Sequence, residues 1–209
     1  MAQDHFERHN HYDGVVDWNF NVVYNDHPSV VAMARAYAPL LKRPELYDPI
    51  PPQWLHATIL RVGTVDDYTE AEMLAVAEKV QTGAANLVLP EFHFGDLVMV
   101  RGNICFRVEP ESALEKLYDI VTDSLESVVG PERATKSPYG RFIAHTSLAY
   151  TRSQNHEAEI EAALNAAHID PAEFRITSMP LIRQRPTNGH YEWEIVRDIS
   201  VGASETQIT

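Results

Sequence analysis

The sequence predicts an α+β fold of two pseudosymmetric lobes, each a mainly antiparallel sheet with helices outside, and an active-site cleft between the lobes. Two observations lead to this prediction. A strand-like segment that contains His56 and Thr58 is matched, later in the chain, by one that contains His145 and Ser147. The elements around both segments also follow one order, namely strand, helix, proline-bearing loop, histidine strand and helix. This repeat of organisation predicts two similar halves that face a shared space.

The first elements are a strand and a helix, followed by a proline-rich loop. Alternating apolar residues predict a half-buried strand at 18–24. Apolar residues spaced three and four apart predict a helix at 28–42. Four prolines make 44–53 a loop, which leads into the first histidine strand at 54–62.

A second helix and a pair of strands complete the first half. Thr69 suits the N-cap of a helix at 69–82, and Gly83 is expected just after the end of that helix. The strand segments that follow are 87–94 and 97–108, the second folded as a hairpin about 101–103.

The second half repeats this order and ends in a hairpin. Its expected elements are a helix at 111–129, a loop at 130–140, a strand at 142–150, a helix at 155–167 and two strands within 174–201. The dipeptide Asn188-Gly189 favours a tight turn between the last two strands. We expect residues 1–16 to form a polar N-terminal arm, 17–201 a single bilobal domain and 202–209 a polar C-terminal tail.

The two histidine strands present the same chemistry on one face. Successive side chains of a strand point to opposite faces, so His56 and Thr58 share a face, with apolar residues behind them. His145 and Ser147 likewise share a face, together with Arg141. Each strand therefore places a proton-transfer group beside a hydroxyl that can donate a hydrogen bond.

A histidine followed two residues later by a hydroxyl is weak evidence when it occurs alone. A third example, His27-Pro28-Ser29, lies where Pro and Ser are typical of a helix start, so we exclude it. A single strand histidine is more often a structural residue that hydrogen bonds hold in place. The matched context of His56 and His145 favours a functional interpretation for this pair.

Composition limits the compartment and the partners. The only cysteine, Cys105, lies among apolar residues and is expected in the core, and we expect a reducing cytoplasm. No segment approaches the roughly 18 apolar residues that span a bilayer, so we expect no membrane partner. A net charge of −13 without a basic run argues against long nucleic acid and suits a nucleotide or short RNA end. We expect a monomer.

The N-terminal arm holds residues of metal-binding type, namely His5, His9, His11 and Asp13. A catalytic zinc ion needs at least three ligands on a rigid frame, and this polar stretch shows no strand or helix pattern. We therefore expect a solvated arm and predict neither a metal ion nor a cofactor.

The segments Leu55-His56-Ala57-Thr58-Ile59 and Ala144-His145-Thr146-Ser147-Leu148 resemble the motifs of the 2H phosphoesterase superfamily and, within it, of the bacterial 2'-5' RNA ligase family. The resemblance extends from about Trp18 to about Val201. It implies the LigT-like fold, in which both motifs face one cleft. It also implies metal-independent activity on 2',3'-cyclic phosphates or 2',5'-linked ends. Ala57 departs from the larger aliphatic residue common in that family, at a position expected to be buried.

The residue chemistry agrees with this resemblance. Opening a cyclic phosphodiester requires a base to activate water and an acid to protonate the departing ribose oxygen, and histidine serves either role near neutral pH. We expect His56 and His145 to be this pair, with Thr58 and Ser147 donating hydrogen bonds to the phosphate oxygens. Which histidine is the base stays open. The candidates for other substrate contacts are Tyr139, Arg141, Tyr150, Arg183 and Arg185, with Trp54 as a further ring for stacking.

Two other functions use the same residues. A 2'-5' RNA ligase would run the reverse reaction, joining a cyclic phosphate to a 5'-hydroxyl. A nucleotide-binding module would hold the phosphate with negligible turnover, because groups that stabilise a transition state also bind related ground states.

Overall fold

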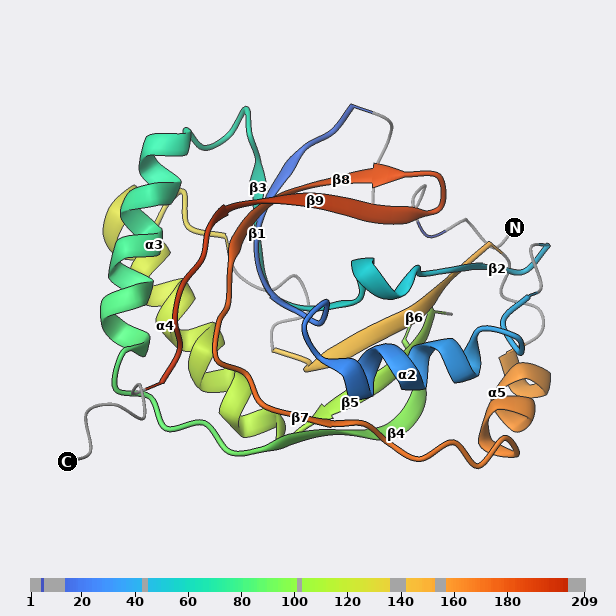
Figure 1. The fold of residues 1–209 in the computed structure, drawn as a ribbon. Coiled ribbons are helices and arrows are strands. Elements are labelled where there is room, and N and C mark those ends of the chain that lie inside the picture. The colour runs from blue at the N-terminus through green and yellow to red at the C-terminus, as the bar shows by residue number, and fades with distance from the viewer. Residues whose placement is uncertain are drawn as a thin grey trace.

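The computed structural model describes residue 5 and residues 14–42, 45–100, 103–135, 142–152 and 157–202. This part of the chain folds into two antiparallel sheets with helices packed against them (Figure 1), which confirms the predicted α+β class. Among the described residues, no helix is long and apolar enough to cross a membrane.

The first sheet has the strand order β3-β1-β8-β9 and contains the first histidine strand. Its members are β1 (Asp17–Val23), β3 (His56–Thr64), β8 (Leu181–Thr187) and β9 (His190–Arg197). The chain therefore completes this sheet with its last two strands, which form a hairpin. Asn188 and Gly189 connect them with φ values of 46° and 83°, the left-handed geometry predicted for an Asn-Gly turn.

The second sheet has the strand order β2-β6-β5-β4-β7 and contains the second histidine strand. Its members are β2 (Tyr47–Pro49), β4 (Phe92–Val100), β5 (Asn103–Glu109), β6 (His145–Thr151) and β7 (Glu173–Phe174). Strand β2 comes from the first half of the chain and pairs with β6. The two sheets are thus not two contiguous halves of the sequence.

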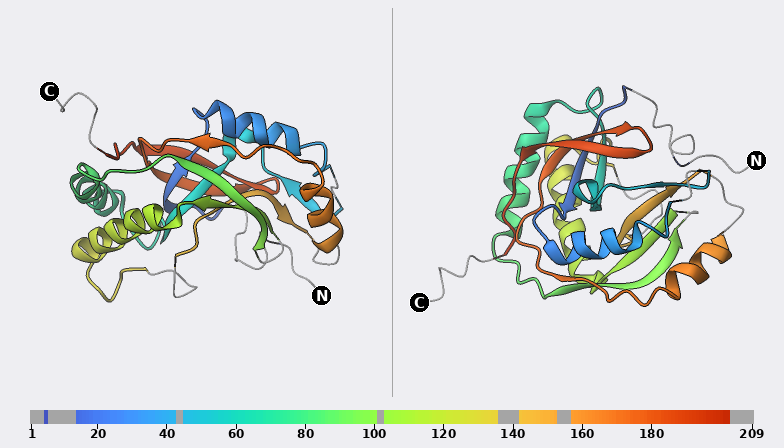
Figure 2. Two further views of the ribbon diagram at one scale, coloured as in Figure 1. Left: turned by 90° about the horizontal axis from the view of Figure 1, so that it is seen from below. Right: turned by 45° about the vertical axis from the view of Figure 1, so that its right-hand side comes forward.

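Helices α2 to α5 pack on this framework, and Figure 2 shows α3 and α4 side by side at one end of the molecule. Helix α4 (Glu111–Val129) contacts both β3 and β5, so it spans the two sheets. Helix α3 (Glu70–Ala84) packs on α4, α2 (Pro28–Tyr37) lies against β7, and α5 (Glu157–Asn165) lies against β4. At the start of α3, Thr69 and Glu72 form a capping box, which confirms the predicted N-cap.

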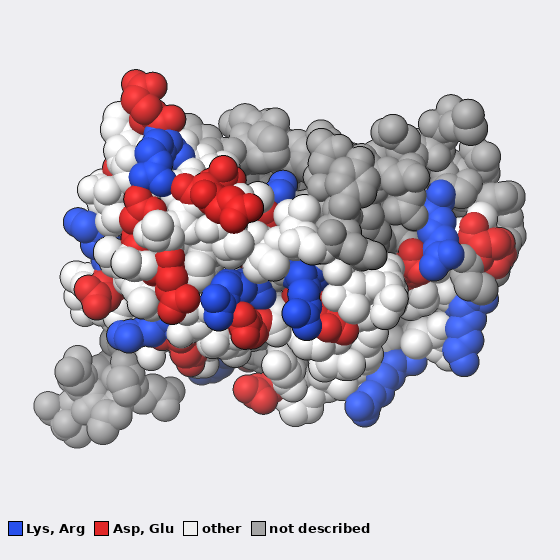
Figure 3. Space-filling model, turned by 90° about the horizontal axis from the view of Figure 1, so that it is seen from above, with Lys and Arg blue, Asp and Glu red and all other residues white. Residues whose placement is uncertain are grey.

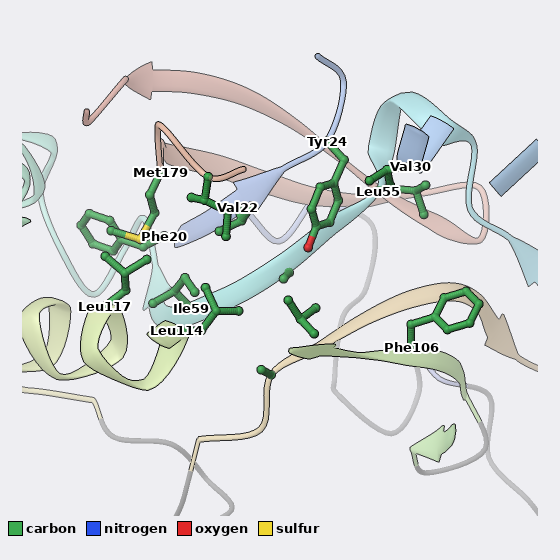
Figure 4. Packing of buried hydrophobic residues seen from close by; sticks show 14 of the residues in the cluster. Phe20, Val22, Tyr24, Val30, Leu55, Ile59, Phe106, Leu114, Leu117 and Met179 are labelled. Carbon is green, nitrogen blue, oxygen red and sulfur yellow. The ribbon is translucent and has the colours of Figure 1, made fainter. Parts of the chain in front are cut away.

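A continuous hydrophobic core joins the sheets and the helices. Figure 4 shows Phe20 and Ile59 of the first sheet packed toward Leu114 and Leu117 of α4. Tyr24, directly after β1, is fully buried, and its hydroxyl makes a 3.0 Å hydrogen bond with the hydroxyl of Thr146 in β6. The backs of the two histidine strands are therefore anchored in one core.

Several predicted boundaries are wrong for local reasons. The helix expected at 28–42 ends at Tyr37, because Pro39 lacks the N–H that an α-helix requires. The strand expected at 54–62 begins at His56, since Pro52–Trp54 form a 3-10 turn. The loop expected at 44–53 includes the short strand β2, which ends at Pro49 and is a border strand of its sheet, where proline is tolerated.

Two further predictions fail because of distant contacts. Gly83 lies inside α3 and not beyond its end; a Cβ atom there would come within 2.9 Å of Ile120 Cγ2 on α4, so glycine permits the close helix packing. The strand expected at 87–94 begins only at Phe92 and, because it pairs with β5, continues as β4 through an irregularity between Phe94 and Leu97 to Val100. The hairpin expected about 101–103 is confirmed, since β4 and β5 pair from Val100 and Asn103 onward.

Candidate active site

His56 and His145 are the first residues of β3 and β6, and these strands of different sheets contact one another. His56 is buried and His145 half-buried. The structure therefore brings together the two strands that carry the predicted pair.

The two imidazoles are held in the same way. His56 Nδ1 lies 3.0 Å from the carbonyl oxygen of Trp54, and His145 Nδ1 lies 2.9 Å from that of Ile143. A carbonyl oxygen only accepts hydrogen bonds, so each Nδ1 carries the hydrogen. In the neutral ring this leaves Nε2 as the atom with the free lone pair, able to accept or return a proton.

Burial weakens proton binding at both rings. It lowers the pKa of His56 to about 4, although the Trp54 carbonyl acts in the opposite direction, and repulsion from His145 lowers that pKa further. Burial also lowers the pKa of His145, partly offset by the Ile143 carbonyl and by the carboxylate of Glu111. Both rings are therefore neutral at pH 7 when the site holds no anion.

The predicted hydroxyls stand on the same faces as the histidines. Thr58 pairs with Asn21 of β1, and Ser147 pairs with Cys105 of β5. The Ser147 hydroxyl lies 3.3 Å from the Cys105 sulfur, and both hydroxyl residues are half-buried. Cys105 is buried as predicted, and its thiol also contacts Ser147, which is a candidate for binding phosphate.

A β-bulge alters the face on which Tyr150 lies. Ile104 pairs with Ala149 and Cys105 with Ser147, so β6 holds one extra residue, Leu148, at this point. Beyond the bulge, Tyr150 returns to the face of Ser147. There its ring stacks on His5, with centroids 4.2 Å apart.

Aromatic rings surround His56. Trp193 meets the imidazole edge-on at 5.0 Å between centroids, and Tyr191 does so at 6.5 Å. Trp54 packs against Trp193 in turn, at 4.9 Å. Tyr191 and Trp193 are two residues apart on β9 and so lie on one face of the strand. This spacing is the feature of the sequence from which their shared position could have been predicted.

Arg183 and Arg185 lie on the opposite face of β8 from Gln184. Gln184 accepts a hydrogen bond from Asn21, which pairs with Thr58, so Gln184 belongs to the histidine face. Arg183 instead lies over the Trp18 ring and forms an ion pair with Glu194. The two arginines are therefore turned away from the histidines, where they would not reach a phosphate held between the two imidazoles.

Other candidates differ in what the structure offers. Tyr139 and Arg141 lie outside the described residues, as do His9, His11 and Asp13 of the N-terminal arm. His5 is described and is buried, contrary to the expected solvated arm. Arg107, which sequence reasoning missed, pairs with His145 and has an exposed side chain. Its position two residues after Cys105 on a strand was the only available signal.

Two surface pockets lie away from the histidines. One of about 290 Å³ is lined by Tyr68 and Arg133, and one of about 570 Å³ lies between α2 and residues 169–173. Neither contains a residue of the histidine motifs. Within the described ranges, no three His, Cys, Asp or Glu side chains gather as a metal site.

Comparisons with known proteins agree with this geometry. A family model described as the 2'-5' RNA ligase superfamily matches residues 29–188. The protein TT0787 of Thermus thermophilus has a similar structure (TM-score 0.63, 15% identity), covering 91% of this chain and 100% of that one. Escherichia coli LigT complexed with 3'-AMP is also similar (TM-score 0.64, 14% identity), with 90% and 98% covered. A search of curated proteins found no match.

Proposed function

Because the chain belongs to the 2'-5' RNA ligase superfamily, we propose that it is a metal-independent phosphoesterase in which His56 and His145 are general acid and base. The proposed substrate is a 2',3'-cyclic phosphate or a 2',5'-phosphodiester of a small nucleotide or RNA end. In the cyclic case, the reaction adds water across one P–O bond and leaves a phosphate monoester.

One observation carries this proposal, namely the matched Nδ1–carbonyl contacts of the two histidines. Two histidines from different sheets use the same ring nitrogen to bond a carbonyl two residues earlier. This arrangement leaves both Nε2 atoms available for proton transfer. A purely structural histidine has no need for a partner held in the same tautomer.

The chemistry requires one histidine neutral and the other protonated. The neutral ring takes a proton from water at Nε2 while the water oxygen attacks phosphorus. As the P–O bond to ribose breaks, the protonated ring gives its Nε2 proton to the departing oxygen. Each ring ends in the state in which the other began, and exchange with solvent restores the pair.

A bound phosphate also favours the protonated histidine that this step needs. Burial lowers both histidine pKa values, so without a bound anion both rings are mainly neutral near neutral pH. A phosphodiester anion beside the rings favours the imidazolium and raises these pKa values. Substrate binding therefore brings the acid into its working state.

Thr58 and Ser147 are proposed to donate hydrogen bonds to the non-bridging phosphate oxygens, where negative charge increases in the transition state. Burial raises the pKa of the Cys105 thiol to about 12, so its sulfur keeps its hydrogen. The neutral thiol beside the Ser147 hydroxyl adds no negative charge to repel the phosphate.

Surface charge supports a small substrate. Figure 3 shows basic side chains beside acidic ones on the face seen from above, and the described pairs include Arg183 with Glu194 at 2.7 Å. Contacts to a long phosphate backbone would require clustered, available cations. The structures of LigT with 3'-AMP, with ATP and with NADP+ contain nucleotides, and this supports a nucleotide-sized ligand here.

The test is turnover of a substrate panel by the purified protein in the presence of EDTA. The panel contains 2',3'-cyclic nucleotides, ADP-ribose cyclic phosphate and 2',5'-linked oligonucleotides, with products identified by phosphorus NMR. We expect a monoester product from at least one cyclic phosphate and no loss of rate in EDTA. The proposed set of two imidazoles and two hydroxyls contains no carboxylate, the ligand on which Mg²⁺ and Ca²⁺ sites depend.

Three outcomes would replace this proposal. Loss of activity in EDTA that a divalent ion restores would mean that a metal takes part. Binding of cyclic nucleotides without any product would make the protein a nucleotide-binding module. Joining of a cyclic phosphate end to a 5'-hydroxyl at a rate above hydrolysis would make it a ligase.

A further inference from the structure

His5 fills an aromatic pocket that lies between the two sheets. The imidazole stacks on Tyr150 of β6, with centroids 4.2 Å apart and an interplanar angle of 23°. It meets Tyr191 of β9 edge-on at 5.9 Å. Only 7% of His5 is exposed, so the pocket encloses the ring.

Both ring nitrogens of His5 are hydrogen-bonded. Asn103 Nδ2 lies 2.8 Å from His5 Nδ1, and the Tyr191 hydroxyl lies 3.2 Å from Nε2. The backbone N–H of Thr151 donates to Asn103 Oδ1 at 3.2 Å, which fixes the amide so that its NH₂ group faces His5. In this pocket, Tyr150 stacks on the face of a flat heteroaromatic ring, and the Asn103 amide donates a hydrogen bond to an acceptor nitrogen at the edge of that ring.

This pocket adjoins the proposed catalytic pair. Tyr191 contacts the His56 ring as well as His5, so one side chain separates the two imidazoles. The bulge at Leu148 places Tyr150 on the face of Ser147. A ribose phosphate held between the histidines would thus direct its base toward this side of the site.

We propose that Tyr150, Tyr191 and Asn103 form a nucleobase subsite, and that His5 of the same chain competes with the base of the substrate for it. This inference rests on the proposed function, because it takes the substrate to be a nucleoside phosphate. Stacking on an aromatic ring tolerates any base, and the Asn103 amide donates to a ring nitrogen or carbonyl oxygen.

Competition from within the chain weakens base binding without changing the chemical step. The apparent dissociation constant equals the intrinsic one divided by the fraction of molecules with the pocket open. If His5 is seated in roughly 70–97% of molecules, its removal lowers KM about 3- to 30-fold. Because His5 does not contact the phosphate in this scheme, kcat stays the same.

The experiment compares His5→Gly with wild type on two substrates that share the reacting group. One is adenosine 2',3'-cyclic phosphate, and the other is methyl riboside 2',3'-cyclic phosphate, which has no base. We expect His5→Gly to lower KM about 3- to 30-fold for the first and to leave the second unchanged. His168→Gly is the matched control, because His168 is exposed and has a φ of 47°, which glycine adopts freely.

A second variant and a direct binding measurement make the result decisive. Tyr150→Leu in the His5→Gly background should raise KM for the adenosine substrate alone. By calorimetry, adenosine should bind His5→Gly more tightly than wild type, and millimolar imidazole should reduce that gain. Adenosine binding does not depend on turnover, so it tests the subsite even if neither cyclic phosphate reacts, in which case the proposed function has failed.

Equal KM changes for both substrates would overturn the subsite and assign His5 a general structural role. Adenosine affinity that is the same in His5→Gly and wild type would overturn it as well.

Discussion

Tyr24 and Thr146 join the two sheets directly behind the proposed catalytic centre. Their hydroxyl oxygens are 3.0 Å apart and buried, and Thr146 lies between His145 and Ser147 on β6. Tyr24 directly follows β1, the strand that pairs with β3. One hydrogen bond thus couples the backbone of the second motif to the sheet that carries the first.

This bond is expected to stabilise the fold as a pair. Tyr24→Phe or Thr146→Val alone should lower the free energy of unfolding by about 1–3 kcal/mol, because a buried polar group loses its partner. The double variant should lose less than the sum of the two, since no hydroxyl is then left unpaired. Urea unfolding of the three variants measures this coupling. Additive losses would show that the bond contributes nothing of its own.

The two histidines should fail as a unit. His56→Ala or His145→Ala should reduce kcat roughly 10²- to 10⁴-fold, the usual contribution of a positioned proton-transfer group. In the double variant, the fold reduction in kcat should be much smaller than the product of the two single reductions, because the second group has little left to do once the first transfer is lost. Steady-state kinetics on the best substrate tests this, with circular dichroism as the control for folding. A single variant that keeps most of its turnover would contradict the mechanism.

The two hydroxyls should contribute less than the histidines. Thr58→Ala and Ser147→Ala should each lower kcat about 10- to 10³-fold through loss of one hydrogen bond to the transition state. Thr58→Ser and Ser147→Thr keep the donor and serve as matched controls that should recover most of the rate. If the alanine variants change KM alone, the hydroxyls bind the ground state and do not act in the chemical step.

The pH optimum of kcat/KM should lie below that of kcat. The free enzyme needs one neutral and one protonated histidine, and burial lowers the pKa of both below the usual 6.5. In the substrate complex the phosphate charge raises these pKa values, so the kcat profile moves to higher pH. Profiles of both constants between pH 4 and 9 measure the difference. Coincident optima would mean that the anion does not act on the pair.

As the pH drops below about 6.5, the free energy of unfolding should decrease, partly because of His56. A histidine whose pKa is lower in the folded state binds protons more weakly there, so the unfolded chain gains protons first and unfolding becomes easier. The pKa of about 4 places this loss between pH 6.5 and 4, and it amounts to roughly 3 kcal/mol at full extent.

His56→Gln removes this titration. Urea unfolding gives the free energy of unfolding of wild type and variant at pH 7 and at pH 4. Between pH 7 and pH 4, the wild type should therefore lose more of this free energy than the variant. A difference that does not change with pH would show that His56 has the same proton affinity in both states.

The sequence predicted what depends on local pattern and missed what depends on distant partners. The strand period placed Thr58 with His56, and turn chemistry placed Asn188 and Gly189 correctly. The bulge at Leu148 arises from pairing with β5, so counting along the strand could not place Tyr150 on the face of Ser147. The position of Gly83 within α3 depends on packing against Ile120, which lies on another helix.

The irregularities of the strands also matter at the sheet borders. The register of β1 and β3 shifts twice, once between Trp18 and Asn19 and once between Phe20 and Asn21. Strand β3 is a border of its sheet, and such bulges twist a border strand so that another chain cannot easily pair with it.

The other three borders are protected by different means. Among the described strands, β7 has two residues, β2 has three and includes Pro49, and β9 carries Glu192 and Glu194. Short strands, proline and charge each discourage edge-to-edge addition. The protein therefore presents poor templates for intermolecular β-pairing and is expected to resist fibrillar aggregation at high concentration.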